Sequence, residues 1–164
     1  LTEAARIARG EISDVAEMSA DKMDALVLPG GFGTAKNLTK WAIKGPDGEI
    51  HSEVKRLIVE MVKAGKPVVG LCMAPTVIAK ALEGSGVEPH LTVGTIKEPS
   101  PYEIGAISAG MEKTGAVAEM KTKAEVLVDA QNKIITAPCY MMEANILEVR
   151  SNTKQAINEL FKLL

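Results

Sequence analysis

The sequence has few aromatic residues and no excess of charge of either sign. Its 164 residues include one Trp, two Tyr and two Phe, too few for a platform on which nucleic-acid bases stack. The 19 basic and 21 acidic side chains give a net charge of −2, so the basic footprint of a nucleic-acid-binding protein is missing. No apolar run approaches the roughly 20 residues that cross a bilayer. We therefore expect no nucleic-acid partner and no insertion into a membrane.

Cysteine and metal-ligand clusters are also scarce. The two cysteines, Cys72 and Cys139, do not make a disulfide framework, which favours a reducing compartment. No group of His, Cys, Asp or Glu has the spacing of metal ligands. The glycine spacing fits neither the dinucleotide fingerprint nor a phosphate loop. The sequence thus predicts no metal and no other cofactor.

The chain is rich in aliphatic residues, and these residues follow a regular pattern along the sequence. Hydrophobic residues make up 46% and charged residues 24%, enough for a buried core. Short apolar runs that read as strands alternate with helical periodicity, and the last two strands read as a hairpin. The strands are expected at 25–28, 67–71, 91–93, 125–128 and 133–137, and the clearest helix at 54–62. This alternation predicts one domain over 1–164, a doubly wound α/β sandwich with a mainly parallel sheet.

The strand-to-helix turn around Cys72 is the first candidate site. Gly70 and Ala74 are small residues two positions to either side of Cys72, the spacing of a nucleophile elbow, where small neighbours let strand and helix approach. A helix N-terminus at this point favours the thiolate. The alternative is a buried structural cysteine, because a free thiol packs like a small hydrophobe.

A glycine-rich turn at 29–33, with the sequence PGGFG, is the second candidate. Its glycines, Gly30 and Gly31 among them, can present backbone N–H groups without side-chain cover, as an oxyanion hole requires. A tight structural turn explains the same residues equally well. Lys36 and Asn37 follow this turn and either orient a substrate or cap the next helix.

A general base is harder to find. Met73 directly follows Cys72, and the histidines, His51 and His90, stand in segments typical of the surface. Cys139 follows Pro138 at the end of a predicted hairpin strand, and it either faces the same crevice as Cys72 or is simply a buried thiol.

Taken together, these motifs resemble those of a known superfamily. The combination of PGGFG-x-AKN with GKP-x-x-x-x-C-x-AP resembles the PfpI and class I glutamine amidotransferase-like superfamily, and within it the ElbB-type branch named for isoprenoid (enhancing lycopene) biosynthesis and for glyoxalases. The similarity extends in order over almost the whole chain. The matching segments are 5–12, 24–38, 64–75, 91–94 and 132–141.

The resemblance implies a flavodoxin-like three-layer sandwich with Cys72 as the nucleophile. It also implies that the amides of Gly31 and Met73 form the oxyanion hole, and that members act without a cofactor on glyoxal or methylglyoxal. Members are commonly homodimers. They are cytoplasmic in bacteria and mitochondrial in animals, and relatives elsewhere in the superfamily are chaperones, proteases or oxidation sensors.

The chain departs from the family pattern in two places. Many superfamily enzymes carry His after the nucleophile where this chain has Met73, so Cys-His amidotransferase or protease chemistry is not expected. The family also begins with a strand-and-helix segment before the position of Leu1, and that segment carries an acidic residue expected to contact the cysteine. We expect this chain to lack that segment and the base on it.

Two classes of function follow from these observations. The leading hypothesis is a glyoxalase-like conversion of a small aldehyde substrate by Cys72. The alternative is a redox-responsive or stress-associated binding protein in which Cys72 is oxidised, or a catalytically inactive subunit of a larger assembly. No residue in the chain argues for isoprenoid chemistry.

Overall fold

A four-stranded sheet lies at the centre of the computed structural model, which describes residues 2–164. Its strand order is β1-β2-β6-β5. The first three strands run parallel, and β5 pairs with β6 in antiparallel orientation. A separate parallel pair is formed by β3 and β4. The strands are β1 Leu26–Leu28, β2 Val68–Leu71, β3 His90–Leu91, β4 Val117–Ala118, β5 Leu127–Asp129 and β6 Ile134–Ala137.

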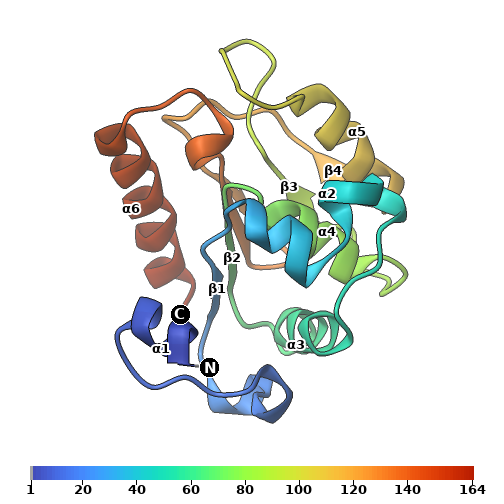
Figure 1. The fold of residues 1–164 in the computed structure, drawn as a ribbon. Coiled ribbons are helices and arrows are strands. Elements are labelled where there is room, and N and C mark those ends of the chain that lie inside the picture. Colours follow the sequence, from blue (N-terminus) through green and yellow to red (C-terminus); the bar gives the residue numbers. More distant parts are fainter. Residues whose placement is uncertain (1) are drawn as a thin grey trace.

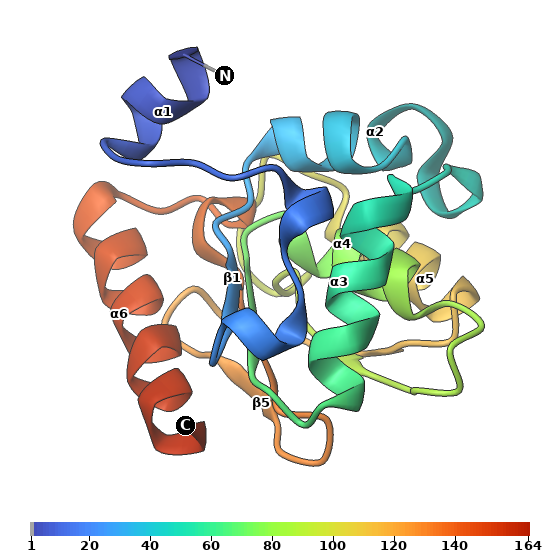
Figure 2. The same ribbon diagram turned by 90° about the horizontal axis from the view of Figure 1, so that it is seen from below.

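Helices cover both faces of this sheet, so the fold has three layers. The α6 helix lies on one side and the α3 and α4 helices lie on the other, as Figures 1 and 2 show from two directions. The helices are α1 Thr2–Ala8, α2 Trp41–Lys44, α3 Ser52–Lys63, α4 Ala74–Leu82, α5 Ile104–Lys113 and α6 Ile146–Leu163. Among residues 2–164, no helix is both long and apolar enough to cross a membrane.

Alternate residues of the central strands pack into the two apolar layers on opposite faces of the sheet. In β2, Val68 belongs to the cluster under α3 and α4, while Val69 belongs to the cluster under α6. Ile134 and Ile135 of β6 divide in the same way. A strand buried on both faces needs apolar residues at successive positions, which is why these strands read as continuous apolar runs. The predicted α/β sandwich with a mainly parallel sheet is confirmed.

The first strand differs from its prediction. The apolar run at 25–28 predicts a strand buried on both faces, yet Val27 in the middle of β1 is 40% exposed. The strand lies at the edge of the sheet as the described residues form it, so one side of β1 has no neighbouring strand. An apolar hollow of about 280 Å³ lies beside it, lined by residues that include Val15, Leu38 and Leu57.

Two predictions about helices are confirmed in part. Ser100 and Glu103 read as a capping box that opens a helix to about Lys113; α5 ends there but begins at Ile104 without a side-chain cap. The Ser100 hydroxyl accepts from the Tyr102 N–H and donates to the Met141 carbonyl at 2.6 Å, a long-range partner that sequence spacing does not encode. Near the C-terminus, the periodicity predicts a helix face that packs on the sheet; α6 packs there through Ala156 and Leu160, but Phe161 of the same predicted face is 68% exposed.

Ala4, Ala5 and Ala8 share one helical face in the sequence and predict a first helix, which is present but is not packed. It covers Thr2–Ala8 and buries none of its residues. Leu1, which the periodicity places on its apolar face, lies outside the described residues.

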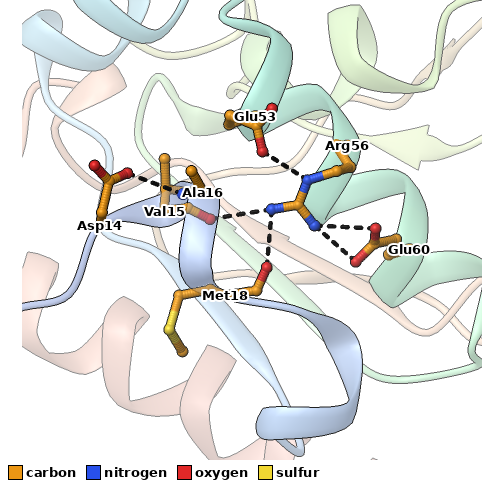
Figure 3. Close-up of polar contacts among 7 residues, drawn as sticks. All are labelled: Asp14, Val15, Ala16, Met18, Glu53, Arg56 and Glu60. Atoms are coloured by element: carbon orange, nitrogen blue, oxygen red, sulfur yellow. Dashed lines mark hydrogen bonds and ion pairs between the residues drawn. The ribbon is translucent and has the colours of Figure 1, made fainter.

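A strap of short helical turns, residues 11–24, connects α1 to β1 and runs alongside α3 (Figure 2). Arg56 of α3 holds it, because its Nη2 donates to the Val15 carbonyl at 3.1 Å and to the Met18 carbonyl at 2.8 Å (Figure 3). Glu53 and Glu60 fix the guanidinium from the same helix, at 2.7 Å and 3.0 Å. Lys66 holds the later part of the segment in the same way, because its Nζ donates to the Ala20 carbonyl at 2.7 Å and to the Met23 carbonyl at 2.8 Å.

Candidate active site

Cys72 occupies a sharp turn between β2 and α4. Its backbone φ is +58°, a left-handed conformation that costs a non-glycine residue roughly 1 kcal/mol or more. Its N–H donates to the Ala137 carbonyl of the neighbouring strand at 2.9 Å. A Cβ at Gly70 would lie 2.6 Å from the Ile78 side chain, so a larger residue would force that side chain to move. This is the geometry of a nucleophile elbow.

The glycine turn packs directly against the elbow. Gly30 and Gly31 have φ of +82° and +84°, which glycine adopts readily. A Cβ at Gly30 would clash with the Leu71 carbonyl and would lie 3.0 Å from the Cys72 Cβ. The Thr34 hydroxyl donates to the Gly30 carbonyl at 2.6 Å, and the Thr34 N–H donates to the Gly31 carbonyl at 3.1 Å. These bonds hold the turn in place.

Two amides at this junction are unused. Within residues 2–164, the N–H groups of Gly31 and Met73 donate to no protein acceptor. Met73 directly precedes α4, so its amide is one of the unpaired donors at the helix N-terminus. Free amides on both sides of a cysteine can bind a negatively charged oxygen.

A pocket of about 340 Å³ opens over Cys72. Both cysteines and three aromatic side chains contribute to its lining. The low aromatic content of the sequence gave no reason to expect the aromatic ones. The pocket is lined by Pro29, Gly30, Gly31, Phe32, Leu71, Cys72, Tyr102, Cys139, Tyr140, Val149 and Thr153. The volume suits a small organic molecule.

Cys139 is a buried second thiol in this pocket, so both alternatives for it hold at once. It is 4% exposed and has a left-handed φ of +49°. Its N–H donates to Oδ1 of the buried Asn152 at 2.9 Å, and its sulfur lies 3.6 Å from Thr153 Oγ1. Burial is the main cause that raises the pKa of the Cys139 thiol, and the charge of Cys72 raises that pKa further. Hydrogen bonds with the Thr153 hydroxyl and the Cys72 N–H lower it and partly offset the rise.

The structure brings together most of the residues that the sequence singles out. Gly30, Gly31 and Cys72 line the pocket, and the Met73 amide lies beside them while its side chain packs into the core. Lys36 and Asn37 are exposed and do not line the pocket. They lie in a π-helical turn, Thr34–Leu38, and neither side chain makes a hydrogen bond within the described residues, so neither substrate orientation nor capping is seen.

Sequence reasoning missed several pocket residues. Tyr140 and Thr153 enter through the turn after β6 and through α6, and Tyr102 enters from the segment before α5. The position of Tyr140 beside Cys139 was an available signal. No local pattern indicates Tyr102, because it lies 30 residues from Cys72 in sequence and its approach depends on the tertiary fold.

The pocket has no conventional base among the described residues. Its lining contains no histidine, carboxylate or lysine. His90 instead pairs with Glu119 at 2.8 Å, and the hydrogen bond that Glu119 accepts raises the pKa of the imidazole. In the part of the chain that the structure describes, no three His, Cys, Asp or Glu residues are placed to hold a metal ion.

Comparison with known proteins places this geometry in context. No protein-family model matches the chain. The human "Glutamine amidotransferase-like class 1 domain-containing protein 3, mitochondrial" is 38% identical over 166 aligned residues, which cover 99% of this chain and 60% of the human protein. The chain thus spans less than two thirds of that relative.

Solved structures have the same fold. An isoprenoid biosynthesis protein with an amidotransferase-like domain from Ehrlichia chaffeensis is 26% identical with a TM-score of 0.83, and the match covers all of this chain and 70% of that one. Drosophila melanogaster DJ-1beta is 20% identical with a TM-score of 0.54, over 91% of this chain and 66% of that one, a similarity of fold alone. The homologues of this chain therefore include a glutamine amidotransferase-like class 1 domain protein and a protein with an amidotransferase-like domain, and the chain shares its fold with DJ-1beta.

Proposed function

We propose that the pocket over Cys72 catalyses the glutathione-independent conversion of small α-oxoaldehydes, such as glyoxal and methylglyoxal, to hydroxy acids. The observation that carries this proposal is the Cys72 elbow with two free amides beside it, that of Met73, the next residue, and that of Gly31, which lines the same pocket. A thiol nucleophile beside an oxyanion hole is the arrangement that carbonyl addition requires.

The reaction begins when the Cys72 thiolate adds to the aldehyde carbon. The carbonyl oxygen becomes the alkoxide of a hemithioacetal, and the amides of Gly31 and Met73 stabilise its charge. The proton on the former aldehyde carbon then moves to the adjacent keto carbon through an enediolate, which leaves a thioester of the 2-hydroxy acid on Cys72. Water hydrolyses the thioester and restores the thiol, so no external oxidant or reductant is consumed.

The proton transfer needs a base that the pocket lining does not contain. The sequence prediction assigns it to a carboxylate on a segment that family members carry before the part matched here. The human relative is longer than the aligned region, which is compatible with that prediction. Full activity is accordingly proposed for the protein with such a segment, as a homodimer or as a subunit of an assembly.

The test is formation of D- or L-lactate from methylglyoxal without glutathione. Wild type and Cys72→Ser are compared, with the thiols reduced and folding checked by circular dichroism. Turnover should fall by at least about three orders of magnitude in the variant, because loss of the nucleophile removes the route through the thioester. Equal lactate formation by both proteins would refute the proposal.

A redox-responsive protein is the second candidate, and the lack of a base in the pocket favours it. In that case peroxide oxidises Cys72 while methylglyoxal is not consumed.

The cellular compartment follows the source organism of the chain. The human relative is named as mitochondrial, and we propose a mitochondrial location for a eukaryotic source and a cytoplasmic one for a bacterial source.

A further inference from the structure

The two cysteines lie just beyond the ends of neighbouring strands. Leu71 of β2 is in register with Ala137 of β6, and the Cys72 N–H donates to the Ala137 carbonyl at 2.9 Å. Cys72 is the first residue after its strand and Cys139 is the second, so the two are offset by one position. Both take left-handed backbone conformations, with φ of +58° and +49°, so the chain turns sharply at a cysteine beyond each of two adjacent strands.

This placement matches what a disulfide requires. Adjacent strands lie roughly 4.8 Å apart, and bridged cysteines have Cα atoms roughly 4.4 to 6.8 Å apart. Cys72 and Cys139 line the same pocket and pack against the same apolar cluster under α6. The sulfur of Cys139 is also near enough to Cys72 for the charge and the N–H of Cys72 to act on it.

The two thiols differ in access. Cys72 is half-buried and can meet a dissolved oxidant. Cys139 is 4% exposed, and burial raises the pKa of its thiol, so it is shielded and protonated at neutral pH. Oxidants should therefore react first at Cys72, because the more exposed thiol is the more susceptible one.

We propose that Cys139 is the resolving cysteine for Cys72, and that peroxide converts the pair into a reversible intramolecular disulfide. The Cys72 thiolate attacks one oxygen of hydrogen peroxide, and the O–O bond breaks to give Cys72 sulfenic acid and, after protonation, water. The Cys139 sulfur then attacks the Cys72 sulfur. The S–O bond breaks, and the departing hydroxide leaves with the Cys139 proton as a second water.

The consequence is a protected, inactive state of the pocket. A disulfide removes the nucleophile from reaction and prevents its further oxidation to sulfinic acid, which thiols do not reverse. The inference rests on the reactive Cys72 that the proposed function also requires, but it is independent of the substrate and of turnover.

Peptide mapping after peroxide treatment tests this directly. Reduced protein is exposed to hydrogen peroxide, free thiols are blocked with iodoacetamide, and the tryptic digest is analysed without reduction. The cysteines fall on separate peptides, 64–80 and 134–150. We expect these peptides linked to each other, with a mass lower by two hydrogens than their sum, and released by dithiothreitol.

The matched variants are Cys139→Ala and Cys72→Ser. At equal peroxide, Cys139→Ala should carry about ten times more sulfinic acid at Cys72, since the sulfenic acid is no longer resolved. In Cys72→Ser, Cys139 should remain an unmodified thiol. The linked peptides in wild type need no variant, so a variant that misfolds does not remove the test.

Three results would overturn the inference. They are sulfinic acid at Cys72 with Cys139 still free in the wild type, a disulfide between two chains, or no oxidation of a Cys72 that iodoacetamide labels readily. If iodoacetamide does not label Cys72 in the folded protein at all, the reactive thiol itself is absent and the proposed function fails as well. Labelled Cys72 without an internal disulfide leaves the proposed function standing and removes only the resolving role.

Discussion

Gly30 and Cys72 meet so closely that the glycine has no room for a side chain. A Cβ at Gly30 would lie 3.0 Å from the Cys72 Cβ and would clash with the Leu71 carbonyl. The φ of Gly30, +82°, also disfavours any other residue. The glycine turn and the elbow are thus one packed unit, and the distance between the Gly31 amide and the cysteine depends on this contact.

Gly30→Ala should consequently destabilise the protein by about 3 kcal/mol, the sum of left-handed strain and a backbone clash. Gly31→Ala is the matched control. Its φ of +84° is nearly the same, but a Cβ there meets nothing within 4 Å, so it should cost only about 1 kcal/mol. Urea unfolding of both variants gives the two values. Equal losses would mean that the contact with the elbow adds nothing.

Asn152 of α6 holds the backbone of Cys139 by a hydrogen bond. It is 1% exposed, its Oδ1 accepts from the Cys139 N–H at 2.9 Å, and its Nδ2 donates to the Glu125 carbonyl at 2.7 Å. Asn152→Ala leaves both backbone groups without partners and should cost about 3 kcal/mol. Asn145→Ala removes the exposed cap of the same helix and should cost about 1 kcal/mol. Thermal or urea unfolding compares them, and an Asn152→Ala loss no larger than that of the cap would contradict this reasoning.

Sequence patterns predicted the elements that are governed by local rules. The apolar run before Cys72 and Pro75 directly after the turn specify strand, elbow and helix in one short stretch, and the structure has β2 and α4 there. The glycine turn was predicted for the same reason, because consecutive glycines favour the positive-φ conformations of a tight turn.

Tertiary contacts decided the rest. Ser100 has the spacing of a helix cap, but its hydroxyl accepts from the Tyr102 N–H and donates to the distant Met141 carbonyl, and α5 begins only at Ile104. Cys139 takes a left-handed turn that no glycine or asparagine signals, because Asn152 of α6 fixes its N–H from 13 residues away. Predicting that turn requires knowing how α6 packs on the sheet.

Arg56 should control the strap formed by residues 11–24 without controlling the core. Arg56→Met removes the donors to the Val15 and Met18 carbonyls while keeping an apolar stem on α3. Amide hydrogen exchange in the strap should then accelerate by about ten-fold, with β2 and α4 unchanged, because local opening precedes global unfolding. Lys63→Met, an exposed position at the end of the same helix, is the control. Faster exchange throughout the sheet would show that the strap is part of the cooperative core.

The Cys139 thiol should make stability depend on pH above neutrality. Burial is the main cause of its raised pKa, so the folded chain keeps this proton at pH values where the unfolded chain has lost it. The contribution is fully present below the pKa of the unfolded thiol and is lost as the pH rises through the folded pKa. The urea midpoint of the wild type should therefore fall relative to that of Cys139→Ala between about pH 8 and about pH 10. Both proteins are measured with reductant, which keeps the thiols free. Titration of Lys and Tyr cancels in the difference because both proteins contain the same Lys and Tyr residues. A difference that does not change with pH would mean that the Cys139 thiol titrates equally in the folded and unfolded chains.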